Sequence, residues 1–300
     1  MSHVMRAFWS NGMSMKRGYL WLHVRLGRPL RDVDVRVLAW AVQASPDWLV
    51  ERSFIASGLT EDRWLRLGTR RFSSATLLAG KSARVCTRCL SEFGFCDLTW
   101  SFKFAPLCNK HGVLLLTECS HCRRTISWDR PQIDICPCGR YFKSALPGAE
   151  LPVSVKDWSI WLAHKLTQAD RRARNRDAVP GILNELSMDG AFRLIEAFGI
   201  LRNPDEQLRV AVAAARSSAG MVGVIVRGLE RLALIDGCLD KVRDIAPQVH
   251  VAALERLRTQ AVDPADVNCA ALLLRKLGHR SDCQVDKRGR HVRGQLTLFI

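Results

Sequence analysis

Apolar residues recur at helical spacing through the second half of the chain. The segment KDWSIWLAHKL places its large apolar side chains on one helical face, namely Trp158, Trp161, Leu162 and Leu166. LSMDGAFRLIEAFG repeats the pattern, with Ser187 as the capping residue and Gly199 at the exit. Stripes of this kind are typical of helices that pack into a protein core, and they need no ligand.

A third segment, DPADVNCAALLLRKLG, carries a full set of helix boundary signals. Asp263 can cap, Pro264 takes the first helical position, Lys276 lies near the end and Gly278 follows. The basic residue near the end complements the helix dipole. These segments predict a helical C-terminal domain with a basic tail over 153–300.

The segment SPDWLVERSFIASGLTEDRWLRLG predicts two short helices nearer the N-terminus. Ser45 can cap the first, with Pro46 at its first position and Gly58 at its exit. Thr60 opens a second helix that ends at Gly68. The expected product is a pair of helices joined by a glycine-containing turn.

Two interpretations of this helix pair are open. In a helix-turn-helix, the second helix would carry basic side chains toward DNA phosphates, namely Arg63, Arg66, Arg70 and Arg71. In an ordinary helical hairpin, the two helices would pack through Trp48, Leu49, Ile55, Trp64 and Leu67. The hairpin is the favoured interpretation.

Length and composition indicate a globular protein. A chain of 300 residues with 48% hydrophobic content can bury sizeable cores, and its length suggests about two domains. The longest apolar stretch, 208–235, is interrupted by Arg209, Arg216 and Arg227, so we expect no membrane span. The first residues lack the continuous apolar core of a signal peptide. We therefore expect a cytoplasmic protein without a membrane partner.

The net charge of +16 and the sequence pI of about 9.9 favour a polyanionic partner, with DNA the leading candidate. Two basic runs, DRRARNRD and KRGRHVR, suit contacts with phosphates. Their cations are Arg171, Arg172, Arg174 and Arg176 in the first run, and Lys287, Arg288, Arg290 and Arg293 in the second. Either run could equally be a solvated loop or tail.

The cysteines cluster in a way that indicates metal binding. Eight of the eleven fall between Cys86 and Cys138, and no export signal is expected that would favour disulfides. Four half-sites follow one another: Cys86-x2-Cys89, Cys108-x2-His111, Cys119-x2-Cys122 and Cys136-x-Cys138. Eight such ligands fill two tetrahedral zinc sites, one with three thiolates and an imidazole and one with thiolates only.

The spacing of the half-sites favours sequential pairing. Eighteen residues separate the first two half-sites and 13 separate the last two, and both are ordinary finger or ribbon loops. The first two half-sites would then share one structural Zn²⁺ and the last two another. GVLLLTE between them suits a buried strand or a link between two modules. An interleaved cross-brace is the alternative, while Cys96 and His121 are expected not to be ligands.

Other chemistry is disfavoured by context. CTRC lacks the βαβ setting of a redox pair. ATLLAGKS satisfies a loose phosphate-loop pattern at 75–82, but neither the preceding strand nor the following helix is predicted. A catalytic zinc keeps one coordination position for water, whereas eight protein ligands for two ions leave none. We therefore expect a non-enzymatic protein.

The cysteine region is similar to the TniQ family of transposition proteins. CTRCLSEFGFCDLTWSFKFAPLCNKHGVLLLTECSHC and the following CPCGR match its signature of C-x-x-C-L, an acidic residue, W, C-x-x-H-G, L-L, C-x-x-C and C-x-C-G. The matching positions that are not metal-ligand candidates are Leu90, Glu92, Trp100, Gly112, Leu115, Leu116 and Gly139. The chain differs from the family pattern at Thr87, Asn109 and Ser120, where prolines are common, at Arg123, where a glycine is expected, and in lacking the N-terminal E-S-x-x-S-W.

The resemblance implies a non-catalytic adaptor that selects target sites for transposition. Its implied partners are DNA, an AAA+ ATPase regulator and, in some systems, an RNA-guided targeting complex, and a homodimer is a further candidate. The alternatives are a zinc-finger DNA-binding or regulatory protein unrelated to transposition and a zinc-dependent nuclease or hydrolase. The expected fold is mainly α with small zinc-finger or zinc-ribbon β elements, divided into an N-terminal helical part (1–85), a tandem zinc module (86–145) and the C-terminal domain (153–300).

Overall fold

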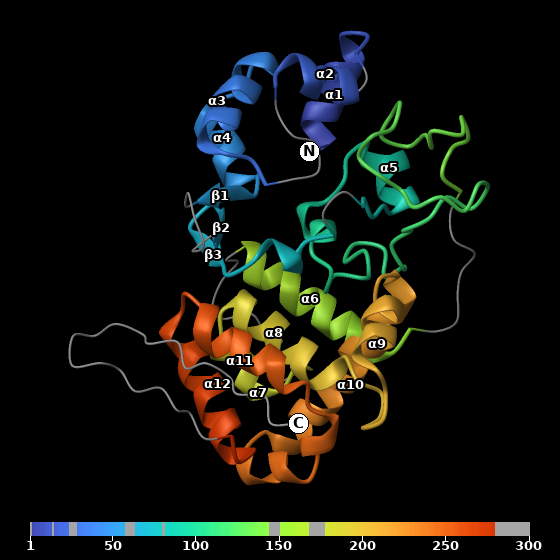
Figure 1. Ribbon diagram of the computed structural model, residues 1–300. Helices are drawn as coiled ribbons and strands as arrows, with labels where there is room; N and C mark the ends of the chain where they lie inside the picture. Colours follow the sequence, from blue (N-terminus) through green and yellow to red (C-terminus); the bar gives the residue numbers. More distant parts are fainter. Residues whose placement is uncertain are drawn as a thin grey trace, which may run out of the picture.

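The computed structural model describes residues 2–13, 15–23, 29–57, 64–79, 82–143, 151–167 and 178–279. These residues form a mainly helical protein with one small sheet, as the sequence predicts, and Figure 1 shows a cysteine-rich region of loops beside two groups of helices. The N-terminal elements are α1 (Ser2–Ser10), α2 (Met15–Trp21), α3 (Asp32–Ala41), α4 (Pro46–Glu51), β1 (Ile55–Ser57), β2 (Trp64–Leu67), β3 (Arg70–Phe72) and the 3₁₀ turn η1 (Ala75–Leu77).

The cysteine-rich region contains α5 (Thr87–Phe93) and η2 (Leu98–Ser101). The helices that follow are α6 (Val153–Thr167), α7 (Gly181–Asn184), α8 (Met188–Gly199), α9 (Leu208–Ala214), α10 (Ser218–Ile235), α11 (Val251–Gln260) and α12 (Pro264–Lys276), with 3₁₀ turns η4 (Leu239–Arg243) and η5 (Ala246–Gln248). Among the described residues no single helix is long and apolar enough to cross a bilayer, although α9 and α10 pass that test as a pair bent by 119°.

The first of the two predicted N-terminal helices is confirmed over a shorter range. The Ser45 hydroxyl accepts a hydrogen bond from the Trp48 N–H at 3.0 Å, and Pro46 is the first helical residue. The helix ends at Glu51, however, and the chain then becomes extended in β1. Gly58, the predicted exit, lies outside the described residues.

The second helix, predicted over Thr60–Gly68, is wrong in its described part, because 64–67 form strand β2. Leu65 and Leu67 are buried while the residues between them are half-buried, which is the two-residue period of a strand. Gly68 has a φ of +55°, and the turn that it makes returns the chain as β3, where Leu65 pairs with Phe72. Neither a helix-turn-helix nor a helical hairpin is therefore present here.

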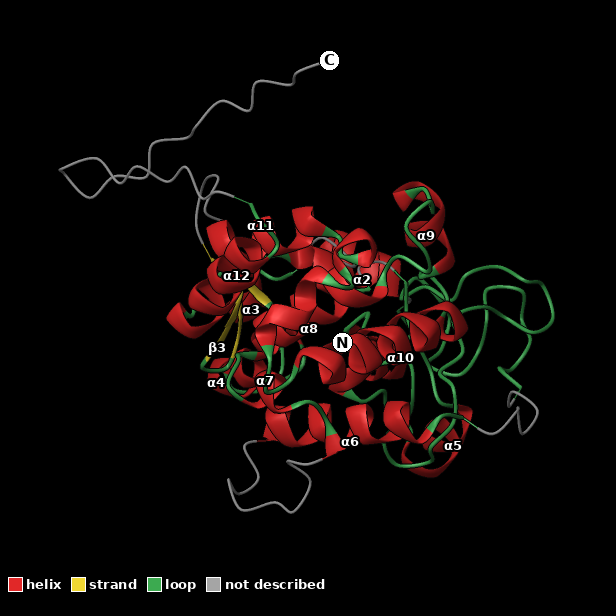
Figure 2. Cartoon of the chain, turned by 90° about the horizontal axis from the view of Figure 1, so that it is seen from below, coloured by secondary structure: helices red, strands yellow, loops and turns green. Residues whose placement is uncertain are grey.

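The predicted C-terminal helices are confirmed with their caps. The Ser187 hydroxyl accepts from the Gly190 N–H at the start of α8, and the Asp263 carboxylate accepts from the Ala265 N–H at the start of α12. Gly278 follows α12 with a φ of +82°. Figure 2 shows the helices grouped around α8, whose side chains are almost all buried.

The cysteine-rich region and the C-terminal helices share one hydrophobic core. Phe102 and Phe104 from this region pack against Phe192 of α8, with ring centroids 5.2 and 5.1 Å apart. Trp158 of α6 is fully buried, and its indole N–H donates to the Phe104 carbonyl at 2.7 Å. The β2–β3 hairpin contributes Leu65 to the same core, so this core runs across the boundaries that composition suggested.

Candidate metal centres

Three of the four predicted half-sites are tight turns with the same backbone pattern. In each turn, the first ligand residue makes two backbone hydrogen bonds. Its N–H donates to the carbonyl of the second residue after the second ligand, and its carbonyl accepts from the N–H of the first residue after the second ligand. The six bonds measure 2.8 to 2.9 Å and join Cys108 to Val113 and Gly112, Cys119 to Arg124 and Arg123, and Cys136 to Arg140 and Gly139. Such turns direct two side chains toward one point.

The residue after the second ligand has a left-handed backbone in all three turns. Its φ is +62° at Gly112, +59° at Arg123 and +81° at Gly139. Glycine adopts this region without a steric penalty, whereas arginine does not. The glycines of the motif are therefore required by the turn, and Arg123 is the one position where the chain departs from that rule.

The first half-site is built differently, at the start of a helix. Cys86 is the N-cap of α5 and Cys89 lies in its first turn, so the helix geometry brings the two sulfurs to the same end. Trp100 and Leu115 pack around them as part of a small buried cluster. This cluster shields the sulfurs from water.

Cys86, Cys89, Cys108 and His111 converge on a single point. Their ligand atoms all lie within 4.8 Å of one another. The His111 Nδ1 is 3.4, 3.2 and 3.6 Å from the sulfurs of Cys86, Cys89 and Cys108, and the last two sulfurs are 3.5 Å apart. A tetrahedral zinc ion with ordinary bond lengths separates two sulfurs by about 3.8 Å, and sulfur from nitrogen by about 3.6 Å. The donor set and its spacing therefore fit zinc.

The protons of the apo site are shared unequally among its thiols. A hydrogen bond from the Cys108 thiol lowers the pKa of Cys86 to about 5. Burial raises the pKa of Cys89 to about 11, and the interaction with Cys86 raises the pKa of Cys108 further still. A divalent cation removes this restriction because it stabilises all three thiolates together.

His111 is held by a carboxylate outside the site. Its Nε2 lies 3.1 and 3.0 Å from the two carboxylate oxygens of Glu92 in α5. A proton on Nε2 donated to Glu92 leaves the Nδ1 lone pair free to face the sulfurs. This is the arrangement by which carboxylates orient metal-binding histidines.

Cys119, Cys122, Cys136 and Cys138 form the second group within 4.8 Å. The sulfurs of Cys119 and Cys138 are 3.9 Å apart and those of Cys122 and Cys136 are 3.6 Å apart, which again fits a tetrahedral zinc site. Burial opposes ionisation of Cys119, but backbone N–H donors outweigh it and lower its pKa to about 7, while burial raises the pKa of Cys136 to about 12. Cys138 is exposed, so this site is the more open of the two.

The grouping is the sequential one that the spacing favours. The first two half-sites meet, the last two meet, and no interleaved set occurs among the described residues. The apolar segment between the sites serves as the link, since Leu116 bridges to Val85 and Leu114 bridges to Leu107. Among the described residues, neither metal-ligand group includes Cys96 or His121.

The predicted DNA-contacting residues are only partly described. Arg66, Arg70 and Arg71 lie on β2 and β3, and not on a helix as predicted. Arg66 is 3.6 Å from Asp32, Arg70 donates to the Lys165 carbonyl at 2.8 Å, and Arg71 stacks over Trp64. The other predicted cations lie outside the described residues, namely Arg63, Arg171, Arg172, Arg174, Arg176, Lys287, Arg288, Arg290 and Arg293.

Sequence reasoning missed a set of exposed cations around the zinc-site turns. Six basic residues of this region are exposed, namely Arg88, Lys110, Arg123, Arg124, Arg140 and Lys143. They occur singly or as one adjacent pair, so a search for basic runs passes over them. Five of the six lie within two residues of a ligand, the exception being Lys143, and this position is the signal that would have found them.

A scan against protein-family models finds no match to the chain, and a search of curated proteins finds no significant match either. The similarity in the cysteine region therefore rests on the motif residues themselves.

Proposed function

We propose that the chain is a non-catalytic, TniQ-like adaptor that links target DNA, or a targeting complex, to transposition machinery. The observation that carries this proposal is the closure of both metal sites. Each site already has four protein donors at tetrahedral spacing, so a bound zinc ion keeps no position for a reacting water. Zinc in such sites supplies folding energy and cross-links the chain.

The protein residues around the sites have a structural role in this proposal. The bound ions hold the three turns and the start of α5 in place, and Glu92 orients His111. The Arg84 guanidinium is buried and donates to the carbonyls of Phe102 and Lys103, which fixes the loop that carries Phe104 into the common core. Loss of the metal would therefore also destabilise the packing of the C-terminal helices.

DNA is the first partner in this proposal. Support comes from the net charge of +16 and from the exposed cations that surround the zinc-site turns. Cations spaced along turns suit contacts with DNA phosphates. Such contacts position a protein on the duplex without reading the DNA sequence. The AAA+ ATPase and the RNA-guided complex enter through the family resemblance and would dock on other faces.

A reconstituted transposition assay tests the proposal. The proposal expects genes for a transposase and an AAA+ ATPase beside the gene of this chain. The chain is combined with these two proteins, and target-site choice is read by sequencing the insertions. We expect insertions to lose their preferred target when the chain is omitted, and Cys108→Ser to have the same effect because it opens the first zinc site. Unchanged insertion patterns without the chain would contradict the adaptor role.

Two biophysical measurements separate the alternatives. DNA binding of the zinc-loaded protein is compared with that of Arg124→Gln and Arg140→Gln, with Arg52→Gln, an exposed arginine of the N-terminal part, as the matched control. Each lost phosphate contact should lower the salt slope by about 1. Cobalt substitution then reports the coordination: an exchangeable water on either ion would favour the hydrolase alternative.

A further inference from the structure

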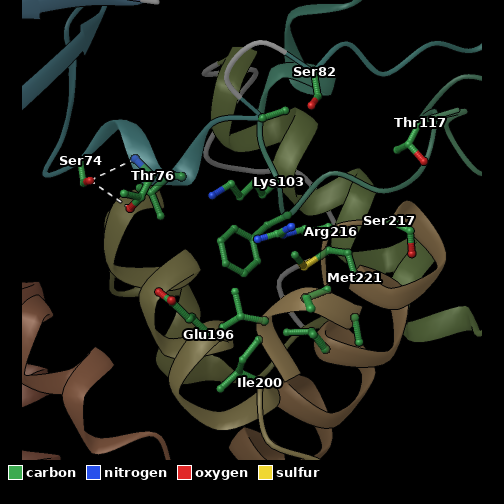
Figure 3. Close-up of a pocket in the computed structure, with 18 of the residues that line it drawn as sticks. Ser74, Thr76, Ser82, Lys103, Thr117, Glu196, Ile200, Arg216, Ser217 and Met221 are labelled. Atoms are coloured by element: carbon green, nitrogen blue, oxygen red, sulfur yellow. Dashed lines mark hydrogen bonds between the residues drawn. The ribbon is translucent and has the colours of Figure 1, made fainter. Parts of the chain in front are cut away.

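A cleft lies where the zinc region meets the C-terminal helices, with a volume of about 1130 Å³. Ser82, Lys103 and Thr117 line it from the zinc region, while α8 and the α9–α10 corner line it from the other side (Figure 3). The segment from Ser74 to Ala79 closes one end. The cleft shares no residue with either metal site, and its size suits a nucleotide-sized ligand.

Positive charge exceeds negative charge around this cleft. Among the described residues, five cationic side chains line it, namely Arg84, Lys103, Arg193, Arg216 and Arg256. Only Glu118 and Glu196 oppose them. Glu196 is shared, because one of its oxygens lies 3.1 Å from Arg193 and the other 3.3 Å from Arg256. One carboxylate between two guanidiniums leaves a net positive charge there.

Two of the cations are left without a direct partner. In the described part of the chain, the side chains of Lys103 and Arg216 make no ion pair and no hydrogen bond, and both extend into the same part of the cleft (Figure 3). Burial lowers the pKa of Lys103. The negative charge of Glu196 opposes this shift, while the positive charges of Arg84, Arg193 and Arg216 add to it, so these cations lie close enough to repel. A fixed anion between them would remove that repulsion.

A buried donor without a partner points to the same place. The Arg193 side chain is only 3% exposed, and its Nε finds no acceptor among the described residues. Such an orphaned donor costs free energy, and because this atom has almost no accessible surface, a ligand in the cleft would satisfy it only if the Arg193 side chain shifted. Ser217, which caps α10, also lines the cleft, so the positive end of an 18-residue helix dipole adds to the field.

Part of the remaining lining is apolar. Phe104, Ile200 and Met221 are buried and form one wall, and Leu208 and Val212 of α9 extend it toward solvent. A ligand that fits has a charged end and a flat or apolar end. A carboxylate would neutralise one cation, whereas a phosphate monoester carries up to two negative charges at neutral pH and matches both Lys103 and Arg216.

We propose that this cleft binds a phosphorylated ligand of nucleotide size, with its phosphate between Lys103 and Arg216 and its organic part against the Phe104 wall. The site does not have the context of a phosphate loop, because Ala75–Leu77 forms a 3₁₀ turn and the described residues of 75–82 contain no strand-to-helix junction. The proposal does not depend on the role in transposition. It adds a ligand that would join the zinc region to the helical domain.

Calorimetric titration of the zinc-loaded full chain tests the proposal, with deoxyadenosine monophosphate, inorganic phosphate and deoxyadenosine as probes. We expect the nucleotide to bind more tightly than inorganic phosphate, and the nucleoside to bind weakest. Lys103→Met and Arg216→Met should each weaken nucleotide binding about tenfold or more, because each removes a charge-assisted contact. Arg209→Met is the matched control, since Arg209 is an exposed arginine of α9 that does not line the cleft, and its affinity should not change.

Further measurements separate a ligand site from a structural role. Lys103→Met should leave the melting temperature of the ligand-free protein unchanged or raised, because it removes an unpaired, half-buried charge. A short DNA duplex that displaces the nucleotide identifies the phosphodiester backbone as the phosphate source, whereas a duplex that binds without displacing it identifies a free nucleotide. Nucleotide binding without any DNA binding would refute direct DNA contact by the proposed adaptor and leave the cleft site standing. Nucleotide affinity that is absent, or equal in wild type and both cleft variants, would overturn the site.

Discussion

Glu92 offers the sharpest test of the first metal site. Its carboxylate lies 3.0 Å from the His111 Nε2, while the His111 Nδ1 faces the three sulfurs. Glu92→Ala removes the group that orients the imidazole and fixes its tautomer. Loss of such outer partners weakens metal binding by about 10- to 100-fold, or about 1.4 to 2.7 kcal/mol. The Glu92 side chain is 49% exposed, so solvent screening places the expected effect near the lower end.

The assay is a competition between the protein and a calibrated chelator, with zinc release followed at equilibrium. Two release steps are expected from the wild type, and Glu92→Ala should shift only the step of the first site. Glu92→Gln should shift it less, because the amide oxygen still accepts from Nε2. Glu118→Gln is the matched control, since Glu118 lies beside Cys119 but its carboxylate contacts Arg123 and not a ligand. Equal zinc affinity in Glu92→Ala and the wild type would refute the role of Glu92.

Three further predictions concern stability. A Cβ at Gly199 would collide with the Val224 carbonyl oxygen where α8 crosses α10, so Gly199→Ala should lower the free energy of unfolding, measured by urea denaturation, by about 1 to 3 kcal/mol. Gly223→Ala in the same helix pair is the control: its Cβ meets only a flexible side chain, so it should not destabilise the protein. Arg123→Gly should leave stability unchanged or raise it by up to about 1 kcal/mol. Glycine relieves the strain of the left-handed backbone at φ +59°, but it also increases the conformational entropy of the unfolded chain, which offsets part of the gain. A clear loss in melting temperature would contradict this. Burial raises the pKa of Asp266 to about 6, so the folded state holds this proton more tightly than the unfolded state, and stability should fall as pH rises from about 4 to about 6. The difference between wild type and Asp266→Asn isolates this slope from zinc release, and identical slopes would refute it.

The sequence was most informative where one local signal decides the structure. Ser187 and Asp263 cap helices because a side-chain oxygen next to free N–H groups has few alternatives. Half-site pairing followed from spacer length, since short loops close with little entropy cost. Both the helix boundaries and the grouping of the eight ligands could therefore be read directly.

The sequence was misleading where tertiary packing overrides local preference. The Trp64–Leu67 segment follows an apparent cap, yet its alternating leucines face the common core and the chain pairs as a strand. The cleft was also beyond prediction, because Lys103 and Arg216 are 113 positions apart in the printed sequence and only the packing of the zinc region against the helices brings them together. Glu92 was noticed as a motif residue, but its contact with His111 required coordinates.

The indole bond from Trp158 to the Phe104 carbonyl, together with the stacking of Phe104 on Phe192, determines how this protein can be dissected. A fragment limited to the cysteine-rich segment would leave the rings of Phe102 and Phe104 facing water, and we expect it to aggregate even when fully loaded with metal. The helical half expressed alone would have a cavity in its core where the rings from the cysteine-rich region normally pack. Fragments made for further study should therefore keep the loop around Phe102 together with α6 and α8, because these segments form one shared hydrophobic core.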